Sequence, residues 1–450
     1  MNERNSLHGP AWHGYLSEPR APVRDIPVFG TAATLDEGIT FRTSPSSRIL
    51  HFVLISSAFL CGWAVLRVGQ INLTLSDVLL SIVLVAMLAR GEINRRPFDN
   101  LTSFWVIGLG LMLSGLLIGS LANGSVDRWL IAGAQYLFAF FLLPMLLAGQ
   151  QVSLTRILPS LFVLGISVSQ IIGIGAMMLF ENGDTKDILG DGFLTGNGRL
   201  GAMAGEPNPN GAMIAFGLPM LFYSIRQRIM PLGIGILCGV ALVWGLLASG
   251  SFTGFSAAVL ATAVYFAVSG FKVFLRGAII GVVALGLFLA SGLPLPASFE
   301  DRVAGALLTG NLDKAGTFTG RAMLIEEAWE MVDDNILVGL GVDGFRKVST
   351  HGAPVHELHL LIWNEGGVVA LAGLVIVLLT MFAAAFVAVS RSRSAGAMIL
   401  AVVIVFNIYT VSIPHMYSRV WILPVLFAIA TVFARGSTHF TSSDKAQPHR

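Results

Sequence analysis

The sequence predicts an all-α polytopic membrane protein with about twelve transmembrane helices and two large loops that contain amphipathic helices. Three observations lead to this prediction. Hydrophobic residues make up 54% of the 450 residues, and charged residues only 12%. The mean hydropathy of +0.76 is far above that of soluble globular domains. Long apolar runs also recur along most of the chain, as helices that cross a lipid bilayer require.

The apolar runs set the predicted spans. A hydrocarbon core about 30 Å thick needs about 20 residues of α-helix, because a backbone group without a partner in lipid costs several kcal/mol. Twelve runs qualify, at residues 49–67, 73–90, 101–121, 129–148, 157–180, 209–224, 230–248, 252–270, 276–294, 366–388, 396–413 and 419–434. We call residues 181–208 the first long loop and residues 295–365 the second long loop.

The basic residues of the short turns predict the orientation. Cytoplasmic turns of membrane proteins carry an excess of Lys and Arg. With the N-terminus in the cytoplasm, the inner turns hold Arg90, Arg95, Arg96, Arg156, Arg226, Arg228, Lys272, Arg276, Arg391 and Arg393. The outer short turns hold only Arg67, Arg128 and Arg419. We therefore expect both termini in the cytoplasm and both long loops on the opposite side of the membrane.

Outside the spans, two tails are expected. Residues 1–48 are polar, rich in Pro, Ser and Arg, and lack the apolar core of a secretory signal. We expect a disordered cytoplasmic tail there, a membrane domain over residues 49–434 and a short cytoplasmic tail over residues 435–450. The net charge of +2 gives no basis for a nucleic-acid partner. Cys61 and Cys238 lie in apolar runs, so we expect small buried side chains rather than disulfides.

The predicted spans carry almost no ionisable side chains. Asp77 and His51 lie near span ends, and the middles of the spans are bare. Ion-coupled transporters generally keep carboxylates or histidines at membrane depth. The pattern therefore disfavours a proton-driven carrier, while a flippase that works through a polar cavity stays open.

The first long loop ends in a cluster of polar residues. Arg199 follows a run of Gly and Asn, and Glu206, Pro207 and Asn208 form a turn just before the next span. Asn and Pro at such a position are typical of a helix start. A solvated loop with a helix cap is the plain interpretation, and a functional loop is the alternative.

The second long loop is far longer than a connector needs, and loops of that length are usually functional or disordered. From Thr319 the sequence TGRAMLIEEAWEMV predicts an amphipathic helix suited to a membrane interface, with Met323 or Leu324, Ala328, Trp329 and Val332 on its apolar face. Arg321 falls in its first turn, where free backbone N–H groups favour an anion and a guanidinium adds a fork for phosphate oxygens. Pairing of Arg321 with a nearby Glu or with lipid headgroups is the alternative.

An ordered set of residues leads from this helix into the next span. It consists of a Gly-Arg pair, a Gly-rich turn, a His followed by Leu and then Glu, and a Gly that opens the span: Gly320, Arg321, Gly339, Gly341, His356, Leu360, Glu365 and Gly367. This set resembles the C-terminal motif of the bacterial O-antigen ligase and polysaccharide polymerase family. Arg199 with Pro207 and Asn208 is similar to that family's first loop motif, so the likeness by motif covers about residues 190–370.

The chain also departs from the family pattern. Glu357 stands where the family usually has Asn or Ser, and His359 stands where an aromatic residue is commoner. After the seventh span the family often has Ser-Arg, and this chain has Ser251-Phe252-Thr253. These departures leave the contacts to the acceptor open.

The resemblance implies a GT-C-like fold in the bacterial inner membrane and an inverting glycosyltransferase without metal or cofactor. Such an enzyme moves a glycan from undecaprenyl diphosphate to a hydroxyl of a glycan or lipid A-core acceptor on the periplasmic face. Negative charge grows on the departing diphosphate, so cations should stabilise it, and Arg199 and Arg321 are the candidates. His356 is the first candidate to orient or deprotonate the acceptor hydroxyl. The remaining candidates for contacts to the substrate are Glu206, Asn208, Glu357, His359 and Glu365.

Several alternatives stay open. Glu357 or Glu206 could act on the acceptor hydroxyl in place of His356. In a different role, His356 could hydrogen-bond the diphosphate, with an oxocarbenium-like transition state that needs little help from a base. A metal site at His351, His356 and His359 is disfavoured. His356 and His359 would share a helical face, but no third ligand with a defined spacing accompanies them. The residues do not separate a ligase from a polymerase. A lipid-linked sugar flippase or another transporter is the rival function, and a membrane scaffold is a third.

Overall fold

The computed structural model describes residues 45–67, 73–180, 185–292, 294–311, 314, 316, 318–414 and 418–436. Most of the two expected tails, residues 1–44 and 437–450, lies outside these ranges. Within the described residues the regular structure is helical, and the only β-type pairings are isolated bridges. The chain is thus an all-α protein, as the composition predicts.

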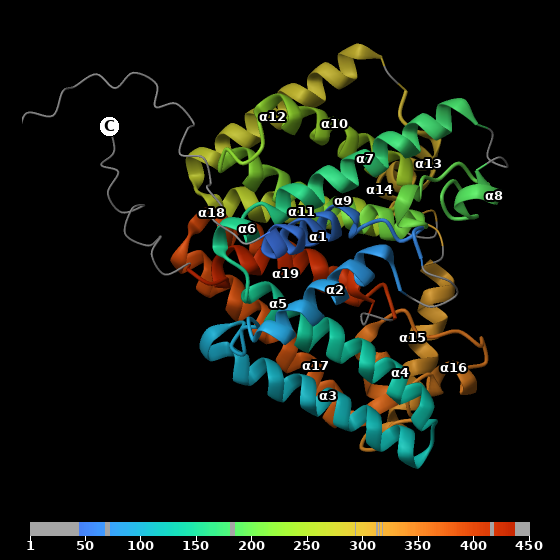
Figure 1. Ribbon diagram of the computed structural model, residues 1–450. Coiled ribbons are helices and arrows are strands. Elements are labelled where there is room, and N and C mark those ends of the chain that lie inside the picture. The colour runs from blue at the N-terminus through green and yellow to red at the C-terminus, as the bar shows by residue number, and fades with distance from the viewer. Residues whose placement is uncertain are drawn as a thin grey trace, which may run out of the picture. The chain divides into compact units, whose positions relative to one another are not determined.

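Figure 1 shows the arrangement of the helices in the described part of the chain. The α-helices are α1 (Pro45–Leu60), α2 (Leu75–Arg90), α3 (Thr102–Ala122), α4 (Val126–Leu137), α5 (Leu143–Ala148), α6 (Val152–Thr155), α7 (Leu158–Leu179), α8 (Lys186–Leu189), α9 (Pro207–Arg226), α10 (Leu232–Ser249), α11 (Phe252–Ser269), α12 (Phe271–Ser291), α13 (Ala297–Phe299), α14 (Gly305–Thr309), α15 (Phe318–Val332), α16 (Gly344–Val348), α17 (Leu358–Arg391), α18 (Arg393–Thr410) and α19 (Arg419–Phe433). Short 3₁₀ or π turns are η1 (Asp99–Leu101), η2 (Phe138–Leu142), η3 (Ala202–Ala204), η4 (Glu300–Ala304) and η6 (Asp333–Asn335).

Each of the twelve apolar runs contains a helix, but not all of these helices meet the requirements of a membrane span. In the described part of the chain, seven stretches are long and apolar enough to cross a bilayer: Asp99–Ala122, Val126–Ala148, Val152–Leu179, Leu232–Ser249, Phe252–Ser269, Leu358–Arg391 and Arg393–Thr410. Helices α1, α2 and α19 have only 16, 16 and 15 residues, short of the length that a bilayer needs. The protein is therefore a membrane protein by its apolar helices, and crossings by α1, α2, α9, α12 and α19 remain a prediction.

Helices α3 and α17 pack closely through glycines. An added Cβ at Gly115 of α3 would lie 2.5 Å from the backbone nitrogen of Ala370 and 2.7 Å from the carbonyl oxygen of Gly366, both in α17. Gly108 lies about two turns before Gly115 on the same face of α3. It meets the backbone of Gly373 in the same way. Small residues let helix backbones approach in this manner inside membranes. The contact fixes α17, whose first turns form the end of the second long loop.

Helix α17 begins earlier than the sequence suggested. The expected span started at residue 366, whereas the helix starts at Leu358 and bends at Gly367, which has φ 68° and ψ −175°. Glu357 is the N-cap, and its carboxylate accepts hydrogen bonds from the backbone N–H groups of His359 and Leu360. Glu365 therefore lies in a helix rather than at the end of a loop.

A buried ion pair joins α2 to α19. The Arg419 guanidinium contacts both carboxylate oxygens of Asp77, at 3.0 Å from Nε to Oδ1 and 2.7 Å from Nη2 to Oδ2. The side chains are 4% and 3% exposed. The Asp77 carboxylate also accepts from the backbone N–H and hydroxyl of Thr74 in a capping box. The sequence placed Asp77 near a span end and Arg419 in an outer turn, but gave no sign that the two meet.

The second long loop has a small core of its own. Leu324, Ala328 and Val332 of α15 are buried with residues of α16 and α17, including Phe345 and Leu361. The apolar face expected at the membrane interface is thus covered within the protein. The exposed residues Met323 and Trp329, which are 48% and 54% accessible, do not share this burial. The loop is packed onto the first half of α17, which places Arg321 and His356 on one well-defined substructure.

Candidate functional site

The backbone of the first long loop holds Arg199 in a defined place. The backbone N–H and the hydroxyl of Thr195 both donate to the Arg199 carbonyl, and the Thr195 hydroxyl accepts from the Arg199 N–H. Gly198 between them has φ 73°, a conformation that glycine adopts without strain. The next residue, Leu200, donates its N–H to the Ala248 carbonyl at the end of α10. The turn therefore carries Arg199 against the bundle.

Two buried amides anchor the same turn from inside. The Asn210 and Gln170 side chains bond each other twice, at 2.7 and 3.1 Å, and Asn210 also donates to the Leu200 carbonyl at 3.0 Å. Both side chains are almost fully buried. Buried polar groups that are satisfied in this way fix a unique packing. Asn210 and Gln170 thus act as positioning residues for Arg199.

The Arg199 side chain is tied down at two points. Its Nε donates to the Ser249 carbonyl at 2.9 Å, and its Nη2 donates to Asn208 Oδ1 at 2.8 Å. Asn208 lies in the first turn of α9, and its carbonyl accepts a 3.4 Å hydrogen bond from the Tyr409 hydroxyl of α18. Asn208 therefore links Arg199 to the C-terminal end of α18.

Arginines from the second long loop lie close to Arg199. Burial is the main reason that the pKa of Arg199 falls to about 10, and the charges of Arg302 and Arg321 lower it further. Burial also lowers the pKa of Arg321; Tyr409 opposes this decrease, and the charge of Arg302 adds to it. Burial likewise lowers the pKa of Arg302. Three guanidinium groups from two separate loops thus share one region, and at neutral pH all of them remain charged.

His356 borders this group of arginines. Its imidazole is partly buried, and burial, followed by the charge of Arg321, lowers its pKa below 6.5. The neutral form of His356 is therefore favoured at neutral pH, and a neutral imidazole can accept a proton. We call Arg199, Arg302, Arg321, His356 and Tyr409 the arginine cluster.

Two members of the arginine cluster have no salt bridge in the described part of the chain: no carboxylate there forms an ion pair with Arg199 or Arg321. Like charges held close together raise the local positive potential, which an incoming anion relieves. A guanidinium fork matches phosphate oxygens better than an ammonium does. The cluster is thus suited to a strongly anionic group such as a diphosphate.

Two members of the cluster were not expected from the sequence. Arg302 lies in the π turn η4, within a stretch that carries acidic and basic residues together and resembles an ordinary surface segment. Tyr409 lies in an apolar span, where an aromatic side chain is usually packing. The sequence signal that could have indicated Arg302 is its place in the same long loop as Arg321, a place that Arg346 shares.

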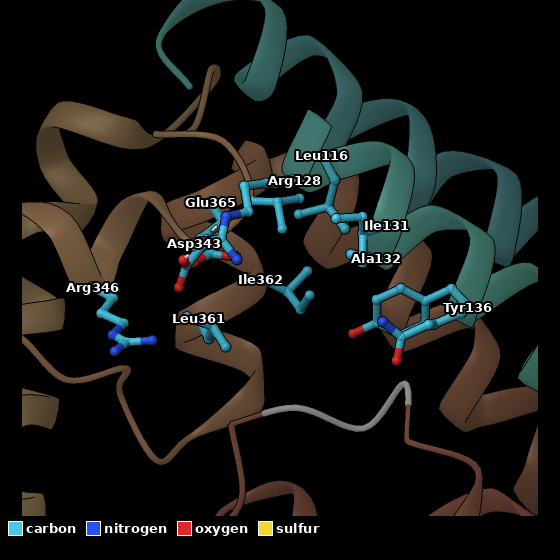
Figure 2. A pocket seen from close by; sticks show the side chains of 12 residues that line it. Leu116, Arg128, Ile131, Ala132, Tyr136, Asp343, Arg346, Leu361, Ile362 and Glu365 are labelled. Atoms are coloured by element: carbon cyan, nitrogen blue, oxygen red, sulfur yellow. Dashed lines mark ion pairs between the residues drawn. The ribbon is translucent and has the colours of Figure 1, made fainter. Parts of the chain in front are cut away.

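The other predicted site residues lie elsewhere or have local partners. Glu206 precedes α9 and is exposed, without a polar contact to the cluster among the described residues. Glu357 caps α17 and also contacts Nδ1 of His359, so both side chains of that pair are engaged with each other. Glu365 is 4% exposed and lines a separate cavity (Figure 2).

The three histidines considered as metal ligands do not form a metal site in the structure. Among the described residues no three His, Cys, Asp or Glu side chains come together as a candidate metal site. His359 is instead paired with Glu357.

The comparisons with known proteins add no identification. No family model and no curated protein matches the chain. The fold shows an all-α membrane protein, and the arginine cluster brings together charged residues of its two long loops.

Proposed function

We propose that this protein transfers a glycan from undecaprenyl diphosphate to an acceptor hydroxyl, as an O-antigen ligase or a surface polysaccharide polymerase. The observation that carries the proposal is the meeting of Arg199 and Arg321 from different loops beside His356. The same three residues belong to the motifs that resemble the O-antigen ligase family. The resemblance implies a lipid diphosphate donor, and the arginine cluster is suited to a strongly anionic group, so the two support the same chemistry.

In the proposed reaction the acceptor oxygen attacks C1 of the donor sugar as the bond from C1 to the diphosphate oxygen breaks. The electron pair of that bond leaves with the diphosphate, and the three arginines stabilise its growing charge. The hydroxyl proton passes to His356, whose lowered pKa keeps it neutral and able to accept. Attack from the face opposite the leaving group inverts the configuration at C1.

The proposal includes a location. With both termini in the cytoplasm of a bacterium and the bundle in the inner membrane, the arginine cluster faces the periplasm. There, a polyprenyl chain can stay in the bilayer while its diphosphate reaches the two long loops. The acceptor is a glycan for a polymerase and lipid A-core for a ligase.

The proposal is tested with purified full-length protein, an undecaprenyl-diphosphate-linked repeat unit and an acceptor. Arg199→Ala, Arg321→Ala and His356→Ala should each abolish transfer, because each removes a group that contacts the reacting ends. Arg95→Ala is the matched control, since Arg95 is exposed and lies in the turn after α2. Full transfer by all three variants would defeat the assignment.

Cells that lack the protein separate the possible roles. Single repeat units without polymer support a polymerase, and finished polymer left on the carrier supports a ligase. Carrier-linked repeat units trapped on the cytoplasmic side would favour a flippase instead. Unchanged glycans would exclude all of these roles.

A further inference from the structure

A polar cavity that does not include the arginine cluster lies at the first turns of α17. The cavity has a volume of about 250 Å³ and lies between α3, α4, the start of α16 and the first turns of α17 (Figure 2). It is lined by Leu116, Arg128, Ile131, Ala132, Gln135, Tyr136, Val342, Asp343, Arg346, Leu361, Ile362 and Glu365. Arg199, Arg302, Arg321 and His356 are not among these residues. No residue of the arginine cluster lies in α17; His356 precedes the start of that helix by two residues.

Polar groups with defined partners form the wall at one end of the cavity. Glu365 is almost fully buried, and its carboxylate accepts hydrogen bonds from the backbone N–H groups of Asp343 and Phe345. Asp343 has φ 61°, an uncommon conformation that Asp tolerates better than most residues. Its carboxylate lies 3.9 Å from Nε of Arg128, and Figure 2 shows the two side chains facing each other. Acceptors and a donor are thus held side by side.

Gln135 supplies an oriented amide to the cavity. Its Oε1 accepts a 3.2 Å hydrogen bond from Nη1 of Arg419, whose other nitrogens hold Asp77. Because the oxygen is engaged, the amide group of Gln135 is left as a donor. The buried ion pair between α2 and α19 therefore fixes one side chain of the cavity.

Apart from Arg346, the remaining lining is apolar or aromatic. Leu116, Ile131 and Ile362 line the middle, and the ring of Tyr136 lies at the end away from Asp343 (Figure 2). Tyr136 is 5% exposed, so its ring has a fixed place. The ligand must therefore present apolar ring surface as well as hydroxyl-type donors and acceptors.

These features favour a sugar over the other small ligands of a membrane surface. A phosphate headgroup could meet Arg128 and Arg346, but its ionised oxygens only accept hydrogen bonds, so it offers no donor to the oxygens of Asp343 and Glu365. A metal ion is opposed by Arg128 and Arg346. A pyranose ring has hydroxyls that both donate and accept and an apolar C–H face. The cavity is smaller than a typical drug-sized pocket, which suits one ring.

We infer that this cavity binds one sugar ring and, if the proposed function holds, that the ring belongs to the acceptor. The second half of the inference rests on the proposed function, whereas sugar binding itself does not. The geometry suits an acceptor because α17, which carries Leu361 and Glu365, begins two residues after His356. A helix rises about 1.5 Å per residue, so these lining residues lie within roughly two turns of the start of α17.

The inference is tested by saturation-transfer NMR on the full-length protein in lipid nanodiscs. The probes are the methyl glycosides of glucose, galactose, mannose, rhamnose, N-acetylglucosamine and N-acetylgalactosamine. At least one should show saturation transfer, and Gln135→Ala and the isosteric Asp343→Asn should each weaken it by about tenfold or more, because a hydroxyl loses its partner. The two controls, Arg95→Ala and Arg199→Ala, should keep the signal.

Several outcomes would overturn the inference. Absence of saturation transfer from every sugar would do so, and so would a signal that survives both cavity variants. Retention of phosphatidylglycerol through detergent exchange, lost in Arg128→Met and without any sugar signal, would assign the cavity to a lipid headgroup instead. Sugar binding that survives Arg199→Ala while no transfer occurs in any preparation would refute the proposed function and leave the sugar site standing.

Discussion

Replacement of Gly115 by Ala should destabilise the protein through the contact between α3 and α17. The added methyl group would lie 2.5 Å from the Ala370 nitrogen and 2.7 Å from the Gly366 carbonyl oxygen. Ordinary contacts begin at 3.4 Å, so the two backbones must separate by about 0.7 to 0.9 Å. Neither atom belongs to a flexible side chain that could rotate away. Forcing extra volume into such packing costs about 1–3 kcal/mol.

Gly110 on the same helix is the matched control. It faces outward, and an added Cβ there meets no atom within 4 Å. Gly110→Ala should therefore be neutral or stabilise the helix by up to about 1 kcal/mol, since Ala loses less backbone freedom than Gly. The Gly115→Ala variant gains the same helix propensity, but its methyl group clashes with the backbone of α17. It should therefore be the less stable of the two by about 1–3 kcal/mol.

The chain carries its own reporters for this measurement. Cys61 and Cys238 are free and buried, at 1% and 3% exposure, so a thiol-reactive dye labels them only as the fold opens. Thermal labelling curves of the two variants in the same detergent give the comparison. Equal midpoints would show that α3 and α17 do not approach as closely as described. Glycan transfer should also fall in Gly115→Ala, because α17 follows directly from the segment that holds His356.

The remaining predictions concern three charged groups. Asp77→Ala leaves Arg419 as an uncompensated buried charge, which should cost about 3–5 kcal/mol in the same labelling assay; an unchanged midpoint would contradict the ion pair. Arg321→Gln removes a positive charge beside His356, so the pKa of His356, read by NMR of the labelled imidazole, should rise, and a fixed or falling pKa would place the two apart. Burial raises the pKa of Glu327, but hydrogen bonds from Ser349 and Thr350 outweigh it and lower the pKa below 4.5. The stability from these bonds is present above pH 4.5 and lost as the pH falls through the lowered pKa, so hydrogen exchange of residues 349–350 should quicken there in the wild type and show no such step in Glu327→Gln.

The positions of the helices could be predicted because hydrophobicity is a local signal. A run of apolar residues is enough to favour a helix in lipid, and each predicted run contains one. The start of α17 was missed for a physical reason. His359, Asn364 and Glu365 are polar and looked like loop residues, yet Asn364 donates to the Ala328 carbonyl and Glu365 receives backbone N–H groups. Polar residues with partners inside the protein extend a helix that hydropathy alone would end.

The contents of the candidate site depend on contacts between distant parts of the chain. Arg199 and Ser249 are 50 residues apart, and Asp77 and Arg419 are 342 residues apart. No local pattern specifies such pairings. Arg199, Arg321 and His356 could be singled out because each stands in a motif with a distinctive spacing. Tyr409 could not, because a tyrosine in an apolar span has the same pattern whether its hydroxyl is used or not.

The central claim is that arginines from the two long loops form one site for a lipid diphosphate. Native mass spectrometry of the purified protein with added undecaprenyl diphosphate tests it most directly. The wild type and Arg95→Ala should retain the lipid. Arg199→Ala, Arg302→Ala and Arg321→Ala should each lose most of it, since each variant lacks one of the cations that bind the same diphosphate. Retention at the wild-type level in all three arginine variants would contradict the claim.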